Sequence, residues 1–189
     1  MIVEKITESI PDSVLVKRFI EGDESSFNKL IERYQKKIYW HARRMTGNHL
    51  DADEVVQEVL IVLYKKLKDF EFKSSLYTWI YKITTTRSIN LINRNKVKKI
   101  FSINEADAER IAKQEDIVDG IINKQKIERM NNLLQKLPVK QREVFILRNF
   151  DELGYEEISE ITGKSVGALK ANYFHALKKI TEMMSNEED

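Results

Sequence analysis

The stretch that decides the fold is DADEVVQEVLIVLYKKLKDFEFKSSLYTWIYKITTTRSINLINRNKVKKI, residues 51–100. It begins acidic, passes through a dense group of aromatic side chains and ends basic. Its first third predicts a helix with Asp51 as the N-cap and one buried apolar stripe at helical spacing. The stripe consists of Val56, Leu60, Leu63 and Leu67.

The opposite face of this predicted helix carries acidic side chains and an amide side chain. At about 100° per residue, the face brings together four side chains that the buried stripe leaves outside. They are Glu54, Gln57, Glu58 and Ile61. An ordinary solvated face has a similar composition, and for an isolated helix that is the simpler interpretation. An aliphatic side chain among acids also suits docking on a basic partner helix.

Aromatic side chains are concentrated just after this helix. Phe70 and Phe72 flank a predicted loop that contains Lys73, Ser74 and Ser75. The next predicted helix starts with further rings at Tyr77, Trp79 and Tyr81. Rings at helical spacing usually belong to a core, but a core does not need two rings beside a loop. We therefore predict that Phe70 and Phe72 stack on nucleic-acid bases, where each stacked base is worth about 1–3 kcal/mol.

Positive charge follows the rings. Residues 76–98 predict a helix, and from residue 82 to residue 99 there are six cations and no acid. A helical count puts Lys82, Thr86, Asn93 and Lys96 on its polar face, with Arg87 and Arg94 nearer the apolar side. Uncompensated positive charge beside a cluster of rings indicates nucleic acid.

The composition narrows the class of protein. The chain has 189 residues, of which 42% are hydrophobic and 33% charged, with only six glycines and two prolines, so we expect a mainly helical protein with two domains. It has no cysteine, which excludes a disulfide framework and a thiolate metal site. No run approaches the roughly 18 apolar residues of a membrane span, and the acid-bearing N-terminus does not resemble a secretory signal. We expect a cytoplasmic protein without membrane insertion, cofactor or metal.

Charge is unevenly distributed along the chain. The formal net charge is only +2, but residues 82–99 and 164–179 are basic, whereas residues 104–119 and the C-terminal tail are acidic. Two basic segments on either side of an acidic spacer predict two contacts with one polyanion.

On the N-terminal side, the sequence predicts two more helices. Residues 12–21 form a short one that ends near Gly22, and residues 24–46 form a long amphipathic one that ends at Gly47. His41 lies within the long helix, where a lone histidine is more often structural than a ligand. We thus assign residues 1–100 to the first domain.

On the C-terminal side, apolar periodicity weakens, so residues 101–124 are predicted to be a flexible linker. A second domain, residues 125–189, begins with helical patterns and has Pro138 at a helix start. Near its end, Gly163 and Lys164 predict a tight turn, and Ser165 caps a final helix that buries Val166, Leu169, Tyr173, Ile180 and either Ala176 or Leu177. The overall expectation is an all-α fold of two small helical domains, the second with a helix-turn-helix.

The second helix of a helix-turn-helix lies in the DNA major groove. Its outward face here combines small residues, which permit close approach to the edges of DNA bases, with positively charged or basic side chains that reach phosphate. The face consists of Gly167, Ala168, Ala171, His175 and Lys178.

Taken together, these motifs resemble the extracytoplasmic-function (ECF) sigma factors of bacterial RNA polymerase, from about residue 12 to residue 180 and in the family's order. DADEVVQEV resembles region 2.2, FEFKSSLYTWIYKI resembles the segment that melts and reads the minus-ten element, and TTTRSINLINRNKVKK resembles region 2.4. The stretch from residue 137 to residue 180 resembles region 4, which reads the minus-thirty-five element. The resemblance implies a promoter-specificity subunit that is not itself an enzyme.

The resemblance also assigns roles to residues. The implied polymerase-docking residues are Asp53, Glu54, Gln57, Glu58 and Ile61. The implied minus-ten residues are Phe70, Phe72, Lys73, Ser74, Ser75, Tyr77, Lys82, Thr86, Asn93 and Lys96, while Trp79 supports the fold. The implied minus-thirty-five residues are Ser165, Gly167, Ala168, Lys170, Ala171, Asn172, His175 and Lys178. The implied partners are core RNA polymerase, promoter DNA and an anti-sigma factor, with a monomer when free.

Two other classes remain open at this point. A repressor or activator with a helix-turn-helix would bind duplex operators unaided and use residues 1–100 to dimerise or to sense a signal. An enzyme acting on nucleic acid is less favoured, because His41, His49 and His175 are scattered and no metal-ligand spacing occurs.

Overall fold

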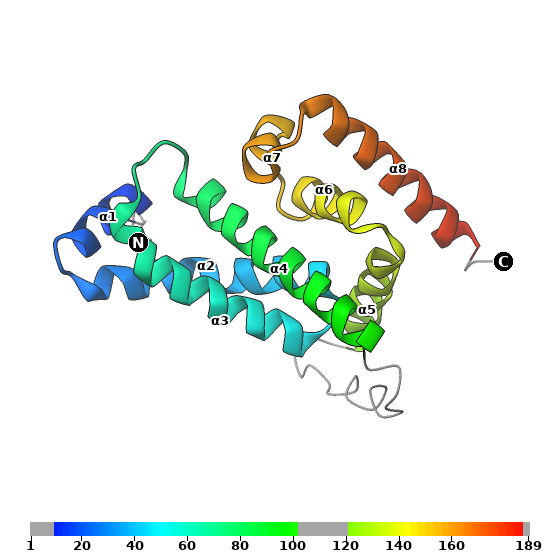
Figure 1. Cartoon of the computed structure of the whole chain (residues 1–189), viewed down its shortest axis with the longest axis horizontal. Helices are drawn as coiled ribbons and strands as arrows, with labels where there is room; N and C mark the ends of the chain where they lie inside the picture. The colour runs from blue at the N-terminus through cyan, green and yellow to red at the C-terminus, as the bar shows by residue number, and fades with distance from the viewer. Residues whose placement is uncertain (1–9, 102–120, 187–189) are drawn as a thin grey trace, which may run out of the picture.

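The computed structural model describes residues 10–101 and 121–186, and every regular element in these two ranges is a helix (Figure 1). Residues 10–101 form the N-terminal domain and residues 121–186 form the C-terminal domain. The predicted all-α fold with a helix-turn-helix at its C-terminal end is confirmed. The acidic spacer at residues 104–119 and the last acids of the tail lie outside the described residues.

The N-terminal domain has four α-helices and one 3-10 turn. They are α1 (Asp12–Ile20), α2 (Glu24–Thr46), α3 (His49–Lys66), η1 (Leu67–Asp69) and α4 (Leu76–Phe101). Local signals set several of these ends: the Asp23 side chain caps α2, and Gly47 ends it with a φ of 91°, which suits glycine. The predicted cap of α3 is wrong, because α3 starts at His49 and the Asn48 side chain accepts from the Asp51 amide at 2.8 Å.

The C-terminal domain also has four helices. They are α5 (Ile121–Lys136), α6 (Val139–Asn149), α7 (Tyr155–Thr162) and α8 (Val166–Ser185). Pro138 precedes α6, Gly163 ends α7 with a φ of 68°, and Ser165 caps α8 by accepting from the Ala168 amide, as the sequence predicts. The start of α5 at Ile121 shortens the predicted linker at its C-terminal end. Residues 102–120 of that linker lie outside the described residues.

The core of the N-terminal domain lies between α2, α3 and α4, with α1 closing one end. Leu63 of the predicted α3 stripe is buried there, and the amphipathic helix α2 buries Leu30, Tyr34 and Ile38. The α3 stripe is wider than predicted, since Val55 and Val59 are buried as well. In α8 the inward residue is Ala176, whereas Leu177 is 44% exposed; the sequence alone left both open.

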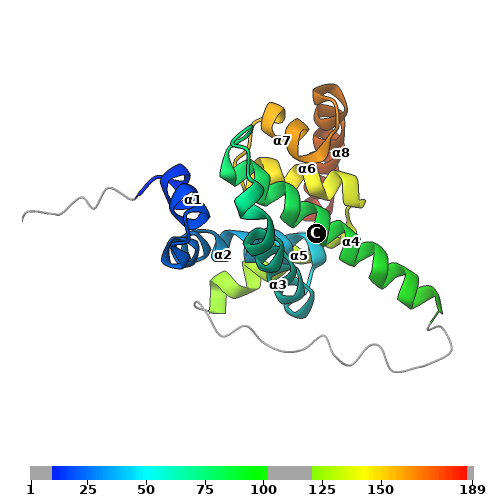
Figure 2. The same cartoon turned by 60° about the vertical axis from the view of Figure 1, so that its left-hand side comes forward.

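The two domains pack against each other. The helices of the C-terminal domain lie alongside the N-terminal domain in Figures 1 and 2: α7 contacts α4, and α5 and α6 contact α2. Met45 of α2 lies in one apolar cluster with Leu134, Ile146 and Ala176 of the C-terminal domain. Tyr81 of α4, which is 3% exposed, lies in another cluster with residues of α6, α7 and α8. The apolar clusters of the C-terminal domain therefore include side chains of the N-terminal domain, among them Met45 and Tyr81.

Candidate functional site

A polar stripe runs along the solvent side of α4. Lys82, Thr86, Asn93 and Lys96 are all exposed, as the helical count predicts. The Thr86 hydroxyl donates to the Lys82 carbonyl at 2.7 Å, which holds this side chain against the helix while its oxygen still has lone pairs to accept with. The stripe thus offers cations and polar groups in the pattern that phosphate and base edges require.

The loop before α4 presents one ring and hides another. Phe72 is 43% exposed and has a φ of 55°, a backbone conformation that is uncommon for a bulky residue. Phe70 is only 8% exposed, and its ring lies 5.1 Å from the ring of Trp79 and 4.9 Å from that of Phe72. The prediction that the core needs neither loop ring is therefore wrong for Phe70, because Phe70 belongs to the buried apolar cluster of the N-terminal domain. Phe72 is thus the more exposed of the two loop rings.

Polar residues of the same loop have defined positions. Ser75 caps α4, since its hydroxyl accepts from the Thr78 amide at 3.0 Å. Lys73 is highly exposed and pairs with Glu71 at 2.5 Å, an acid within the loop that partly compensates its charge. Ser74 is half-buried beside them.

Tyr77 does not face open solvent, although the resemblance assigns it to DNA. Its hydroxyl donates to the backbone carbonyl of Asp151 in the C-terminal domain at 3.0 Å, and its ring lies 4.4 Å from that of Tyr81. Burial raises the pKa of Tyr77, so this hydroxyl keeps its proton and acts as a donor. In the packed arrangement, Tyr77 is part of the contact between the domains.

The acidic face of α3 lies against α4, and part of its charge is paired. Glu54 accepts a hydrogen bond from Arg94, and Glu58 lies 3.6 Å from Arg87. The hydrogen bond that Arg94 donates to the Glu54 carboxylate raises the pKa of Arg94. The helical count predicts that Arg87 and Arg94 lie near the apolar side of α4. In the structure both side chains extend toward α3, where they contact Glu54 and Glu58.

Other members of this α3 face remain accessible. Gln57 is exposed, and Ile61 is 54% exposed in spite of its aliphatic side chain. Asp53 lies 3.2 Å from His49 one turn earlier. The face therefore combines an exposed aliphatic side chain with carboxylates in exposed ion pairs, and such pairs contribute only about 0–1 kcal/mol and exchange partners at low cost.

The outward face of α8 is open, as predicted. Gly167, Ala168, Ala171, His175 and Lys178 are all exposed. The remaining predicted contact residues are arranged around this face. Ser165 is the helix cap, Lys170 lies over the Tyr155 ring at 5.7 Å, and Asn172 donates to the Ala168 carbonyl at 2.8 Å. A helix N-terminus with small side chains lets backbone amides approach phosphate closely.

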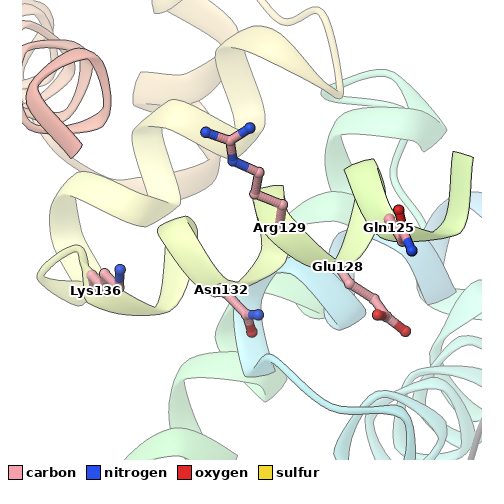
Figure 3. A pocket seen from close by; sticks show the side chains of 5 residues that line it. All are labelled: Gln125, Glu128, Arg129, Asn132 and Lys136. Carbon is pink, nitrogen blue, oxygen red and sulfur yellow. The ribbon is translucent and has the colours of Figure 1, made fainter. Parts of the chain in front are cut away.

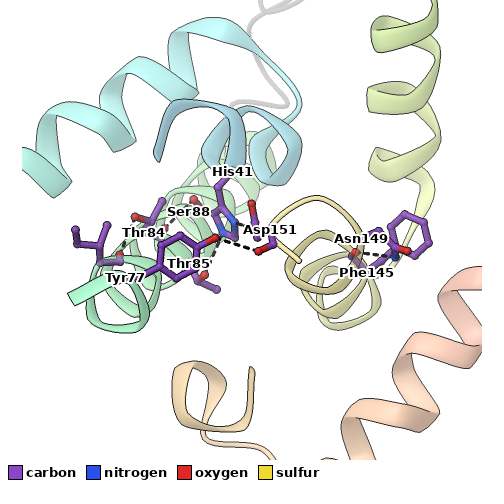
Figure 4. Close-up of polar contacts among 9 residues, drawn as sticks. His41, Tyr77, Thr84, Thr85, Ser88, Phe145, Asn149 and Asp151 are labelled. Atoms are coloured by element: carbon purple, nitrogen blue, oxygen red, sulfur yellow. Dashed lines mark hydrogen bonds and ion pairs between the residues drawn. The ribbon is translucent and has the colours of Figure 1, made fainter. Parts of the chain in front are cut away.

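A buried polar cluster, which no sequence pattern predicts, joins the two domains. His41 of α2 is fully buried, and its Nδ1 lies 2.6 Å from a carboxylate oxygen of Asp151 while its Nε2 lies 3.0 Å from the Thr85 hydroxyl (Figure 4). The spacing of His41 from Ile38 and Met45 is a signal that it faces inward. Nothing local in the sequence indicates that its partner is 110 residues away.

Elsewhere in residues 10–101 and 121–186, few polar side chains converge as they would in a catalytic or ligand-binding site. A shallow hollow on α5 is lined by polar side chains from this one helix that do not converge on a common point (Figure 3). They are Gln125, Glu128, Arg129, Asn132 and Lys136. Within residues 10–101 and 121–186, no group of three or more acidic or histidine side chains is arranged to hold a metal ion. None of the helices in the described part is sufficiently long and apolar to cross a membrane.

Two family models match the two domains. Residues 30–97 match sigma-70 region 2, and residues 127–180 match sigma-70, region 4. The chain is similar to the ECF RNA polymerase sigma factor SigW of Bacillus subtilis, with 32% identity over 162 residues that cover 82% of this chain and 87% of SigW. It is also similar to the ECF RNA polymerase sigma-E factor of Escherichia coli strain K12, with 30% identity over 183 residues that cover 93% of this chain and 95% of that protein.

Solved structures share the fold. CnrH in complex with the cytosolic domain of CnrY has a TM-score of 0.70 and 19% identity, and the match covers 93% of this chain and 97% of CnrH. The sigma factor RpoE of Bartonella quintana in complex with the anti-sigma factor NepR has a TM-score of 0.68 and 20% identity, with coverage of 84% and 96%.

Proposed function

This chain belongs to the extracytoplasmic-function sigma factors of RNA polymerase, and we propose that it binds core RNA polymerase and directs initiation at specific promoters. One observation carries the proposal: each domain presents an exposed face with DNA-binding chemistry, a basic stripe on α4 and a face of small residues on α8. The N-terminal domain reads and melts the minus-ten element, and the C-terminal domain reads the minus-thirty-five element. The catalytic groups for nucleotidyl transfer belong to the polymerase.

The α3 face docks on a basic surface of core polymerase in this proposal. Gln57 and Ile61 are accessible for direct contact, and Glu54 and Glu58 exchange their arginine partners on α4 for cations of the polymerase. Asp53 adds negative charge at the start of the same face. Because the existing ion pairs are exposed, the exchange costs little.

A pull-down with core polymerase tests this docking face. Ile61→Asp is expected to weaken the affinity for core at least ten-fold, because it removes the apolar centre of the face. Ile20→Asp is the matched control, since Ile20 is an exposed apolar side chain of α1, 41% exposed and outside the α3 face. Equal affinities for the two variants would contradict the docking surface.

The minus-ten contact uses the loop and the α4 stripe. The ring of Phe72 stacks on an extruded base, Lys73, Ser74 and Ser75 surround it, and Lys82 and Lys96 contact phosphate along the stripe. Thr86 and Asn93 lie between these cations and contact base edges or sugar. Opening a duplex costs a few kcal/mol per extruded nucleotide, and one base stack contributes about 1–3 kcal/mol in return.

A fluorescent base analogue in the minus-ten element measures strand opening. Phe72→Ala is expected to reduce open-complex formation at least ten-fold while leaving closed-complex affinity within two-fold. Tyr64→Ala is the matched control, because Tyr64 is a similarly exposed ring on α3, 48% exposed. If Phe72→Ala lowers duplex docking as much as opening, the ring does not act in melting.

The minus-thirty-five contact uses the N-terminal half of α8. Gly167, Ala168 and Ala171 approach base edges, and Ser165, Lys170, Asn172, His175 and Lys178 lie along phosphates and groove edges. Ala171→Glu is expected to abolish the preference for the minus-thirty-five sequence, whereas Lys178→Ala weakens binding evenly across sequences and reduces the salt slope by about 1. An unchanged sequence preference in Ala171→Glu would contradict the assignment.

Run-off transcription with core polymerase on genomic DNA tests the function as a whole. The expected result is initiation at a defined set of start sites that core polymerase alone does not use. A protein that confers no start-site selection, yet binds palindromic duplexes as a dimer, would instead be the operator-binding regulator.

Further properties belong to the same proposal. The protein acts in the cytoplasm as a monomer until it meets polymerase. An anti-sigma protein is a further proposed partner, because two structurally similar sigma factors were solved with such partners or with a cytosolic domain bound. Co-purification from the native cell, with and without the inducing stress, identifies that partner.

A further inference from the structure

An ion pair ties the turn of the helix-turn-helix to α6. The Lys164 ammonium donates to the carboxylate of Glu143 on α6. Only 3% of the Glu143 side chain is exposed, against 26% of the Lys164 side chain. By comparison, the pair between Arg87 and Glu58 leaves 37% or more of each side chain exposed. Glu143 is thus a carboxylate that folding removes from water, and Lys164 compensates its charge.

The backbone of Lys164 is fixed as well. Its carbonyl accepts from the Ser159 hydroxyl at 2.7 Å, and its amide donates to the Thr162 hydroxyl at 3.3 Å. Gly163 before it has a φ of 68°, and Ser165 after it caps α8. Lys164 therefore joins the end of α7 to the start of α8, and its side chain joins both to α6.

Apolar contacts already hold these three helices together. One buried cluster contains side chains from all of them, including Val144, Leu147, Ile158 and Leu169. A buried ion pair adds little net stability to such a core, because the cost of desolvating two charges offsets their attraction. Apolar contact is non-directional, whereas an ammonium must meet one particular carboxylate. The pair is therefore better suited to fixing the position of the turn than to holding the domain folded.

Position matters because the outward face of α8 consists of small residues. Gly167, Ala168 and Ala171 are exposed and follow shortly after Lys164 in the chain. A long side chain can change its rotamer and keep a base contact when its helix shifts, but a methyl group or a hydrogen atom cannot. Contacts made by such residues require the backbone itself to lie within about 0.5 Å of its productive position.

We propose that the Glu143–Lys164 pair positions the first turns of α8 and thereby determines how sharply the chain discriminates between minus-thirty-five sequences. This inference rests on the proposed function, because it takes α8 as the helix that reads this element. Glu143 and Lys164 are positioning residues: they act through the turn and the start of α8, not through base contacts of their own.

A variant that replaces both charges separates positioning from stability. Glu143→Met combined with Lys164→Met leaves no buried charge unpaired, so its melting temperature is expected to stay within about 4 °C of the parent. Its holoenzyme is then compared on two promoter duplexes, one with the minus-thirty-five sequence of a start site found by run-off transcription and one with that sequence scrambled. The ratio of the two affinities is expected to fall about five-fold or more, since base contacts are lost.

Two further variants act as controls. Lys164→Arg keeps the charge and is expected to keep the affinity ratio within about two-fold of the parent. Ile180→Val lies at the far end of the same helix and is 4% exposed. It is expected to lower the melting temperature by a few degrees and to keep the ratio within about two-fold. A loss of stability alone therefore does not reproduce the loss of discrimination.

Hydrogen exchange in the full chain measures the turn without polymerase or DNA. In the double methionine variant, amides of residues 162–169 are expected to exchange about ten-fold faster than in the parent, while those of α2 and α3 are unchanged. An unchanged exchange rate, or an affinity ratio that falls as much in Ile180→Val as in the double variant, would overturn the positioning role. Absent start-site selection by the parent would instead be a failure of the proposed function, and the exchange measurement keeps the two failures distinguishable.

Discussion

Gly47→Ala is expected to destabilise the protein more than any other glycine substitution with a comparable backbone angle. Gly47 ends α2 with a φ of 91°, and a Cβ built there would lie 2.5 Å from Cδ and 2.7 Å from Cγ of Gln135 in the C-terminal domain. Gly22 is the matched control, because its φ of 104° is similar while nothing lies within 4 Å of its Cβ position.

The magnitude follows from these two environments. A non-glycine residue in the left-handed region costs about 1–2 kcal/mol, and this cost applies at both positions. At Gly47 the new methyl also displaces Gln135, whose amide donates to the Arg44 carbonyl and accepts from Arg142. Losing two such hydrogen bonds adds about 1 kcal/mol each. We expect a total of about 3–4 kcal/mol for Gly47→Ala and about 1–2 kcal/mol for Gly22→Ala.

Urea unfolding followed by tryptophan fluorescence measures the difference, since Trp40 and Trp79 both lie in the N-terminal domain. In a Gln135→Ala background the additional cost of Gly47→Ala should disappear, which is a double-mutant cycle for the contact. If the two glycine substitutions lower the free energy of unfolding by the same amount, within about 0.5 kcal/mol, Gly47 does not lie against Gln135. That result would contradict the contact between the two domains at this point.

Three further predictions concern single sites. Phe70→Ala should lower the free energy of unfolding by about 3–5 kcal/mol, because it empties a core position that is only 8% exposed. Phe72→Ala should lower it by about 1 kcal/mol, because this ring is 43% exposed; urea unfolding compares the two variants. Arg142→Met should lower the free energy of unfolding by about 2–3 kcal/mol, because the buried guanidinium donates to carbonyls of both domains. A clearly smaller loss in the same assay would show that these hydrogen bonds contribute little to stability. Two serine hydroxyls lower the pKa of Asp23 from 3.8 to about 2, so its carboxylate stabilises the fold above pH 4 and this contribution is lost as the pH falls toward 2. Melting temperatures of Asp23→Ala and the parent should accordingly converge at low pH, and a constant difference would contradict the assignment.

Local patterns in the sequence were sufficient for most of the helices and for the outward faces of α4 and α8. Helix periodicity depends only on residues within a few turns, so the exposure of Lys82, Thr86 and Ala171 could be predicted without knowing the fold. The ends at Gly47 and Ser165 followed for the same reason, because a glycine with positive φ or a capping hydroxyl acts within one turn.

Local rules were less reliable where two residues competed for one role or where a contact was long-range. Asn48 and Asp51 can both cap a helix, and in the structure Asn48 is the cap of α3. Phe70 looked dispensable for the core because its ring partner Trp79 lies nine residues further along the chain, on the next helix.

Residue patterns alone predict an all-α chain with two faces suited to DNA, since each face is a property of one helix. Knowledge of the packing is needed to see that Glu54 pairs with Arg94, that Tyr81 lies in an apolar cluster of the C-terminal domain, and that His41 contacts Asp151. The physical reason is that such pairings depend on which helix faces meet, and this choice minimises the free energy of many distant contacts together. No window of the chain contains that information.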